Sequence, residues 1–248
     1  PPKVVLVPTG SELCTNPDAL AAGQIMESNR IALSAALRPW PVNLMAVDPV
    51  GDALSDIESA LKQACESGDF ILLSGGVSVG AYDFVKEAVK NLGGETIFWK
   101  VAQKPGKPLL FAKLGERWIF GLPGNPAACL VCFYEYVLPA IQSWLGYGFA
   151  ETGMETMSVQ LRGSYSKKDS FVHFVRAVAT QNENNQISAS PLPAQASHLM
   201  AAFAECNCIM LAPENAQQLQ TGDRVMIRRI PGTPLKVKKH ENHCTSLC

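Results

Sequence analysis

A glycine-rich segment, Ser74–Gly80 with the sequence SGGVSVG, follows a short apolar run at Phe70–Leu73. Glycine allows a ligand to approach the backbone closely, and successive N–H groups ahead of a helix favour an anion. The segment therefore predicts a phosphate-binding loop, to which Ser74 and Ser78 add hydroxyl groups. Asp83, just beyond it, is either a helix cap or a carboxylate directed into the site for metal binding or phosphate chemistry.

A second loop, Lys104–Pro108 with the sequence KPGKP, carries two ammonium groups. Two prolines stiffen it and Gly106 lets it turn. A basic turn is often only solvated. Preorganised cations, however, lose less entropy when they bind an oxyanion, so Lys104 and Lys107 are candidate oxyanion ligands.

A third loop, Gly121–Pro126 with the sequence GLPGNP, again joins a predicted strand to a predicted helix. A rigid turn at a helix N-terminus suits a phosphate group, although Asn125 is also a normal helix cap. Glu12 and Asp52 follow the first two predicted strands. Each is either a metal ligand or an ordinary loop carboxylate, and Asp52 is also a candidate cap for the next helix.

The order of elements in residues 1–146 places these loops together. Strands are expected over residues 3–8, 42–47, 70–73, 96–102, 109–113 and 118–121, and the last two should form a hairpin. Helices are expected at residues 29–37, after 52, after 83 and from 125 onward, and the last of them should break at Pro139. Alternating strands and helices predict an α/β fold, a parallel sheet with helices on both faces. Ligands bind such sheets beyond the carboxyl ends of the strands.

Helical periodicity ends near Gly146. Residues 147–232 predict a small all-β domain, a barrel or sandwich, with strands at 157–161, 171–179, 186–189, 208–211 and 224–229. Residues 233–248 are polar and basic, and we expect a disordered tail there.

The composition of the chain excludes several classes of protein. Hydrophobic residues make up 47% of the chain and the formal net charge is −1, which argues against disorder and against a nucleic-acid-binding surface. No apolar run is long enough for a membrane span and no signal peptide is visible, so we expect a cytoplasmic protein. The first residue is Pro1 rather than methionine, which indicates a fragment or a processed chain.

The cysteines fit buried positions better than a zinc site. Cys129 and Cys132 lie in an apolar helical stretch, Cys206 and Cys208 alternate in a predicted strand, and Cys65 lies on the apolar side of another predicted helix. A Cys-x-x-Cys pair without a second ligand pair is a weak metal signal.

Taken together, the motifs TGSEL, GQIMESN, SGGVSVGAYD, KPGKP and GLPGNP, in this order, resemble the molybdopterin molybdenumtransferase family, which includes the C-terminal domain of gephyrin. The resemblance runs from about Val4 to Ile230. It implies a molybdopterin-binding α/β domain followed by a C-terminal β-domain. It also implies an enzyme of molybdenum cofactor biosynthesis, which binds adenylylated molybdopterin and molybdate, inserts molybdenum into the dithiolene and releases AMP.

The resemblance also assigns roles to residues. Glu12, Asp52 and Asp83 match acidic catalytic positions that hold Mg²⁺ or another divalent cation. The residues it implies for substrate binding are Thr9, Ser74, Gly75, Gly76, Ser78, Gly80, Lys104, Lys107, Gly124, Asn125, Arg176 and Ser197. From the strand pattern alone, Arg176 would face solvent.

The chain departs from the family pattern at Ser11, where aspartate is common, and at Ala128, where serine is common. Full-length relatives carry a preceding region that supplies homodimer contacts and further active-site carboxylates, so we expect this chain alone to bind its substrates but turn them over poorly. Two alternative functions are a molybdopterin adenylyltransferase and a non-catalytic scaffold module like that of gephyrin.

Overall fold

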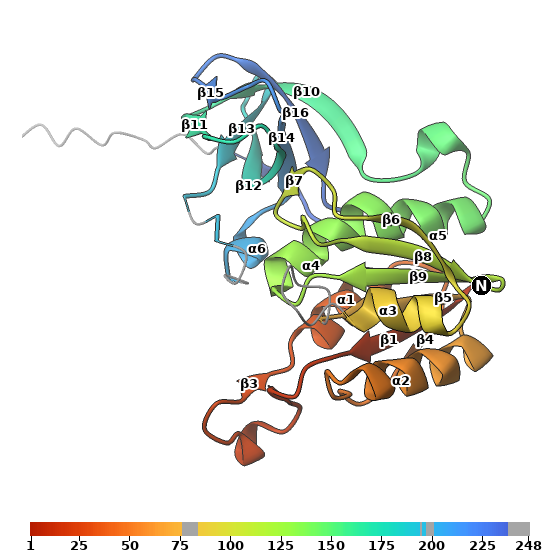
Figure 1. Ribbon diagram of the computed structural model, residues 1–248. Helices are drawn as coiled ribbons and strands as arrows, with labels where there is room; N and C mark the ends of the chain where they lie inside the picture. The colour runs from red at the N-terminus through yellow and green to blue at the C-terminus, as the bar shows by residue number, and fades with distance from the viewer. Residues whose placement is uncertain (76–83, 194, 197–200, 238–248) are drawn as a thin grey trace, which may run out of the picture. The chain divides into compact units, whose positions relative to one another are not determined.

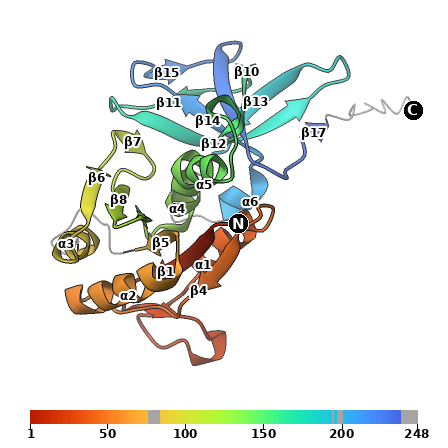
Figure 2. The same ribbon diagram turned by 90° about the vertical axis from the view of Figure 1, so that its right-hand side faces the viewer.

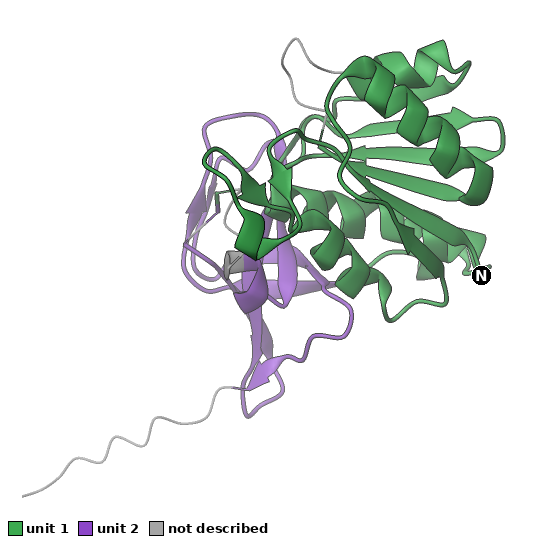
Figure 3. Cartoon of the chain, turned by 90° about the horizontal axis from the view of Figure 1, so that it is seen from below, with its two compact units in different colours: residues 1–154, 196–200 green, residues 155–195, 201–248 purple. Residues whose placement is uncertain are grey.

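The computed structural model describes residues 1–75, 84–193, 195–196 and 201–237 (Figure 1). The chain divides into two compact units, Pro1–Met154 with Ala196–Met200 and Glu155–Gln195 with Ala201–Cys248 (Figure 3). Among the described residues, no helix has the length and apolar character needed to cross a membrane.

The first unit contains a six-stranded sheet with the order β4-β1-β5-β9-β8-β6. Its strands are β1 (Lys3–Pro8), β4 (Asn43–Ala46), β5 (Phe70–Ser74), β6 (Glu95–Trp99), β8 (Leu110–Leu114) and β9 (Arg117–Leu122). The four strands β4, β1, β5 and β9 are parallel, whereas β8 is antiparallel to both β9 and β6. The predicted α/β fold and the β8–β9 hairpin are therefore confirmed.

Helices cover both faces of this sheet (Figure 2). On one face, α2 (Leu54–Ser67) contacts β1 and β5, and α3 (Phe84–Asn91) contacts β6 and β8; both helices bury apolar side chains in the same core cluster. The other face is covered by α1 (Asn29–Leu37), which contacts β1, and by α4 (Pro126–Cys132), which contacts β9. Since both faces are covered, every residue of β5 is buried, as is typical of a parallel strand in the middle of a sheet.

The long C-terminal helix of this unit is divided, as predicted for Pro139. Helix α4 continues into a π-helical turn, η2 (Phe133–Val137), and then into α5 (Leu138–Trp144), in whose first turn Pro139 lies. Proline lacks the N–H that an α-helix needs, so the change of hydrogen-bond pattern falls just before it.

The remaining elements of the first unit are short: β2 (Leu13–Cys14), η1 (Pro17–Ala19), β3 (Ile25–Met26), β7 (Gln103–Lys104) and η3 (Phe149–Glu151). The unit ends at Met154 instead of at the predicted residue 146. The reason lies in two contacts: the Gly153 N–H donates to the side-chain oxygen of Gln142 on α5, and Met154 is buried.

In the second unit, five strands form a closed barrel. They are β10 (Glu155–Leu161), β12 (Val172–Gln181), β13 (Ile187–Pro191), β14 (Cys208–Ala212) and β16 (Arg224–Arg229). The order β13-β10-β16-β14-β12 is closed by pairing between β12 and β13. The five strands predicted for this region and the all-β class are thus confirmed. Closure leaves no free sheet edge among these strands.

Smaller elements complete the second unit: β11 (Tyr165–Ser166), which pairs with β15 (Gln218–Leu219), α6 (Ala201–Glu205) and β17 (Lys236–Val237). The expected disorder from residue 233 is wrong for residues 233–237, because β17 pairs in parallel with the end of β12. Residues 238–248 lie outside the described part of the chain.

Lys167 holds a loop of the barrel together from inside. Its side chain is buried, and its ammonium group donates to the backbone oxygens of Asp169, Phe171 and Glu214 at 3.1, 2.8 and 2.9 Å. Replacing it with methionine removes the donor to three partly exposed carbonyl groups, so Lys167→Met should lower the free energy of unfolding by about 1–3 kcal/mol.

Urea denaturation measures this loss, and Lys168→Met is the matched control because the neighbouring Lys168 is exposed. Equal stability of the two variants would contradict the structural role given to Lys167.

Candidate functional site

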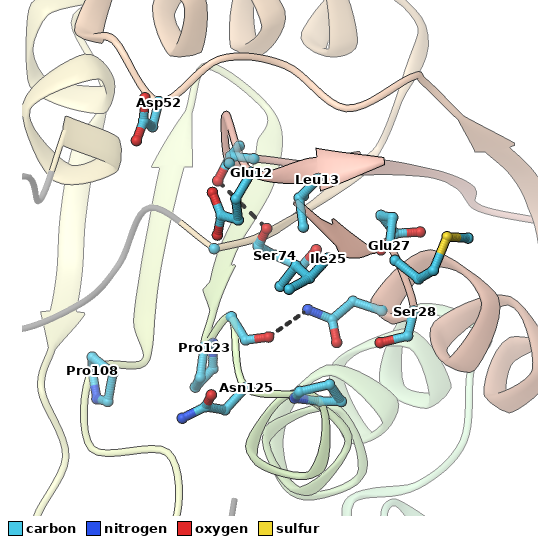
Figure 4. A pocket seen from close by; sticks show the side chains of 17 residues that line it. Glu12, Leu13, Ile25, Glu27, Ser28, Asp52, Ser74, Pro108, Pro123 and Asn125 are labelled. Atoms are coloured by element: carbon cyan, nitrogen blue, oxygen red, sulfur yellow. Dashed lines mark hydrogen bonds between the residues drawn. The ribbon is translucent and has the colours of Figure 1, made fainter. Parts of the chain in front are cut away.

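A pocket of about 580 Å³ lies where β1, β5 and β9 end, at the carboxyl edge of the parallel strands (Figure 4). This is the edge at which the sequence predicts ligand binding. The pocket is lined by Thr9, Gly10, Glu12, Leu13, Ile25, Met26, Glu27, Ser28, Asn29, Asp52, Ser74, Gly75, Pro108, Pro123, Gly124, Asn125 and Pro126. Its volume is in the range of small-molecule and cofactor sites.

The floor of the pocket is built from closely packed backbone. The Thr9 N–H donates to the Ser74 oxygen at 2.9 Å, and the Gly75 N–H donates to the Leu122 oxygen at 3.1 Å. Gly75 has φ +99°, and a Cβ atom there would lie 2.2 Å from the backbone oxygen of Thr9. Only glycine fits this point, where the predicted phosphate loop begins.

Three carboxylates line the pocket, those of Glu12, Glu27 and Asp52, and Glu12 and Asp52 come from separate loops. Glu12 folds back over Gly10, where a Cβ atom would lie 2.7 Å from Oε2, and it lines the same pocket as Ser74 (Figure 4). The Oδ1 atom of Asp52 accepts a hydrogen bond from the Ser11 hydroxyl at 2.7 Å. Asp52 is not the helix cap, because α2 begins after Ala53 and has no side-chain cap.

The segment GQIMESN contributes five lining residues that the sequence analysis did not assign to the site, Ile25 to Asn29. The Asn29 amide donates to the backbone oxygen of Gly124 at 2.9 Å and so ties the start of α1 to the GLPGNP loop. Glu27 is buried and its Oε1 accepts from the Arg30 N–H at 2.8 Å. The side chains of Glu27 and Asn29 therefore fix the N-terminus of α1 beside the pocket.

The lysine loop lies beside the pocket and contributes Pro108 to its lining. Lys104 and Lys107 are exposed, and neither is a lining residue. Inside the loop, the Val101 N–H donates to the Lys107 oxygen at 2.9 Å, and the Leu109 N–H donates to the Gly106 oxygen at 3.2 Å.

Arg176 belongs to β12 of the second unit, and only 1% of it is exposed, so the expected solvent-facing orientation is wrong. Burial lowers its pKa, with opposing contributions from Cys206 and Tyr165. The side-chain amide of Gln195 fixes the backbone of Arg176, accepting from its N–H at 3.1 Å and donating to its oxygen at 2.9 Å.

Seven of the predicted residues, Thr9, Glu12, Asp52, Ser74, Gly75, Gly124 and Asn125, come together in this one pocket. Asn125 is the N-cap of α4 by position, as predicted, but its side chain makes no cap hydrogen bond. Five other predicted residues lie outside the described part of the chain: Gly76, Ser78, Gly80, Asp83 and Ser197.

The predicted burial is confirmed for Cys129, Cys132, Cys206 and Cys208, whereas Cys65 is only partly buried. Burial raises the pKa of the Cys129 and Cys132 thiols, so the thiolate that a metal or an electrophile needs is disfavoured at neutral pH.

Comparison with known proteins gives the same picture as the motifs. Residues 6–143 match the family described as "Probable molybdopterin binding domain", and residues 158–228 match "MoeA C-terminal region (domain IV)". The chain is 34% identical to the molybdopterin molybdenumtransferase of Haemophilus influenzae, over 91% of this chain and 55% of that protein. It is 33% identical to the molybdenum cofactor synthesis protein cinnamon of Drosophila melanogaster, over 92% of this chain and 37% of that protein.

A solved structure of a molybdopterin biosynthesis MoeA protein from Pyrococcus horikoshii has the same fold, with a TM-score of 0.78 and 24% identity over 94% of this chain and 55% of that chain. The chain spans about half the length of the molybdopterin molybdenumtransferases that it matches. It therefore belongs to the molybdenum insertase family of molybdenum cofactor biosynthesis, as a molybdopterin-binding domain followed by a MoeA-type C-terminal region.

Proposed function

We propose that this chain binds adenylylated molybdopterin and molybdate and forms part of an enzyme that inserts molybdenum into the dithiolene with release of AMP. The observation that carries the proposal is the pocket at the carboxyl edge of the sheet, where residues of three strand-to-helix loops meet. The match of residues 158–228 to the MoeA C-terminal region favours this reaction over molybdopterin adenylylation.

The polar groups of the pocket suit the phosphates and the polar ring of such a substrate. Ser74 and Asn125 offer a hydroxyl and an amide from opposite loops, and the α4 N-terminus follows Asn125 directly. A helix N-terminus and neutral donors stabilise phosphate charge. These groups would bind and orient the adenylylated substrate, and the exposed apolar side chains of Ile25 and Met26 would pack against it.

Glu12 and Asp52 fit a divalent cation, because Mg²⁺ in phosphate sites usually needs only one or two carboxylates besides phosphate oxygens and water. Both carboxylates line the pocket and both residues are exposed, so hydrated metal and phosphate can reach them. A metal ion held there would neutralise phosphate charge. Asp83, outside the described residues, is proposed as a third ligand on the family resemblance.

We assign Lys104 and Lys107 to molybdate, and Arg176 and Ser197 to further oxyanion contacts, on the same resemblance. Both lysines are exposed, and they belong to the loop that contributes Pro108 to the pocket lining. Homodimer formation and a cytoplasmic location stay predictions.

Lys107→Ala tests the molybdate assignment. Two charges about 4 Å apart near a protein surface interact by about 1–4 kcal/mol, so the dissociation constant for molybdate should rise at least about 5-fold and at most about 1,000-fold. Thermal stability should not change, because Lys107 is exposed. Equilibrium dialysis with molybdate measures the affinity.

The matched control is Lys62→Ala, which removes an exposed lysine of α2 away from the pocket. An unchanged molybdate affinity in Lys107→Ala would show that this lysine is only solvated.

A further inference from the structure

Gln103 is a buried glutamine beneath the lysine loop, with only 1% of its surface exposed. Its side-chain nitrogen donates to the backbone oxygens of Pro105 and Gly106 at 3.3 and 3.2 Å. Its side-chain oxygen accepts from the hydroxyl of Tyr136. One side chain therefore holds two consecutive carbonyl groups of the loop that carries Lys104 and Lys107.

The orientation of this amide follows from its partners. Two carbonyl oxygens at one end require the NH₂ group there, so the amide oxygen must face Tyr136. Burial raises the pKa of Tyr136 to about 12, so its hydroxyl is protonated and able to donate at neutral pH. The hydroxyl thus sets which way the Gln103 amide points.

Tyr136 reaches this position from the π-helical turn η2 (Phe133–Val137). π-Helical turns are rare and often lie at functional sites. The same divided helix also places Cys132 under the loop, with its sulfur 3.6 Å from the Gln103 side-chain nitrogen. A single helix therefore supports the loop through two side chains.

The lysine loop packs tightly against Gln103 and Cys132. Gly106 has φ +93°, and a Cβ atom there would lie 2.4 Å from the Cys132 sulfur and 2.7 Å from the Gln103 side-chain nitrogen. The turn is pressed onto the amide, so a shift of the Gln103 side chain would be transmitted to the backbone that carries the lysines.

We propose that Gln103 and Tyr136 are positioning residues for molybdate binding: they fix the backbone of Lys104–Pro108 so that both ammonium groups are held in place for the oxyanion. The proposal rests on the proposed function of the lysine loop. A purely structural role would lower stability without selectively affecting the loop or the oxyanion.

Three substitutions separate these roles. Gln103→Met keeps the length and removes both polar ends, and Tyr136→Phe removes only the hydroxyl. Each should raise the dissociation constant for molybdate about tenfold, in the range found when supporting groups of a metal site are lost. Gln103→Glu still accepts from Tyr136 but places a carboxylate against the two carbonyl oxygens, and it should cause the largest loss, about 100-fold.

Gln142→Met is the matched control, because Gln142 is also a buried glutamine and its side chain binds the Gly153 N–H instead of the lysine loop. It should lower the melting temperature while leaving molybdate affinity as in the unmodified chain.

Hydrogen exchange of the Val101 and Leu109 amides reports on the loop without any ligand, since both donate to carbonyl groups of the loop. Exchange at these two amides should accelerate at least tenfold in Gln103→Met and Tyr136→Phe but not in Gln142→Met.

Unchanged exchange and unchanged molybdate affinity in Gln103→Met would overturn the proposal, as would an equal loss of affinity in Gln142→Met. If Lys107→Ala leaves molybdate affinity unchanged, the molybdate assignment itself fails. In that case the hydrogen-exchange rates of the Val101 and Leu109 amides alone test whether Gln103 positions the loop.

Discussion

Gly75→Ala is expected to lower the free energy of unfolding by about 2–5 kcal/mol and to remove binding of the adenylylated substrate. Two costs add: an L-residue at φ +99° is strained by about 1–2 kcal/mol, and relief of a severe overlap costs about 1–3 kcal/mol more. The overlap is with the backbone oxygen of Thr9, 2.2 Å from the added Cβ atom. Thr9 directly follows β1 and its N–H is hydrogen-bonded to Ser74, so its backbone cannot move as a flexible side chain would.

Gly93→Ala separates the two costs. Gly93 has a similar φ of +81°, but a Cβ atom there meets nothing within 4 Å. This control should lose only about 1–2 kcal/mol and keep its substrate affinity. Urea denaturation gives both free energies, and calorimetry with adenylylated molybdopterin gives the affinities. Equal destabilisation of the two variants would show that Gly75 and Thr9 do not approach as closely as described.

Much of the fold follows from local patterns. The apolar runs at β1 and β5, the helix ending before Pro39 and the turn between β8 and β9 all depend on residues close in sequence. Chain order and the rules for parallel sheets then suffice to bring the strand ends to one edge. For this reason the three loops could be placed at a common site before any contact was known.

Features that depend on distant contacts were not predicted. Asn29 joins the site through a hydrogen bond to Gly124, 95 residues away in sequence, and nothing near Asn29 indicates that partner. Arg176 alternates with apolar residues on β12, which favours a solvent-facing position, but its burial depends on the tertiary environment of that strand. Asp52 has the spacing of a helix cap, and the competing hydroxyl of Ser11 comes from another strand exit.

The support of the lysine loop also depends on contacts between residues that are distant in sequence. The sequence KPGKP indicates a stiff turn, but it does not indicate that Gln103 lies beneath it or that Tyr136 orients the amide. Tyr136 and Gln103 are 33 residues apart, and Tyr136 lies in the π-helical turn before Pro139. A proline in a helix predicts a change of hydrogen-bond pattern but not its form.

The proposed metal site gives the largest expected effect on the reaction. Glu12→Gln and Asp52→Asn keep the size of each side chain and remove its charge. Single-turnover release of AMP from adenylylated molybdopterin, with molybdate and Mg²⁺ present, should fall about 10²–10³-fold in each variant, as when one preorganised group that stabilises a transition state is lost. Melting temperatures should change little, because both residues are exposed.

Two further measurements assign the cause of this loss. Binding of Mn²⁺ in the presence of adenylylated molybdopterin, followed by electron paramagnetic resonance, should weaken about 10- to 100-fold in both variants. Glu66→Gln removes an exposed carboxylate on α2 away from the pocket and should change neither quantity. If the carboxylates act by holding the metal, raising the Mg²⁺ concentration should restore part of the AMP release. A slow rate that no concentration of metal improves, with Mn²⁺ affinity intact, would mean that Glu12 and Asp52 act directly on the substrate and not through a cation.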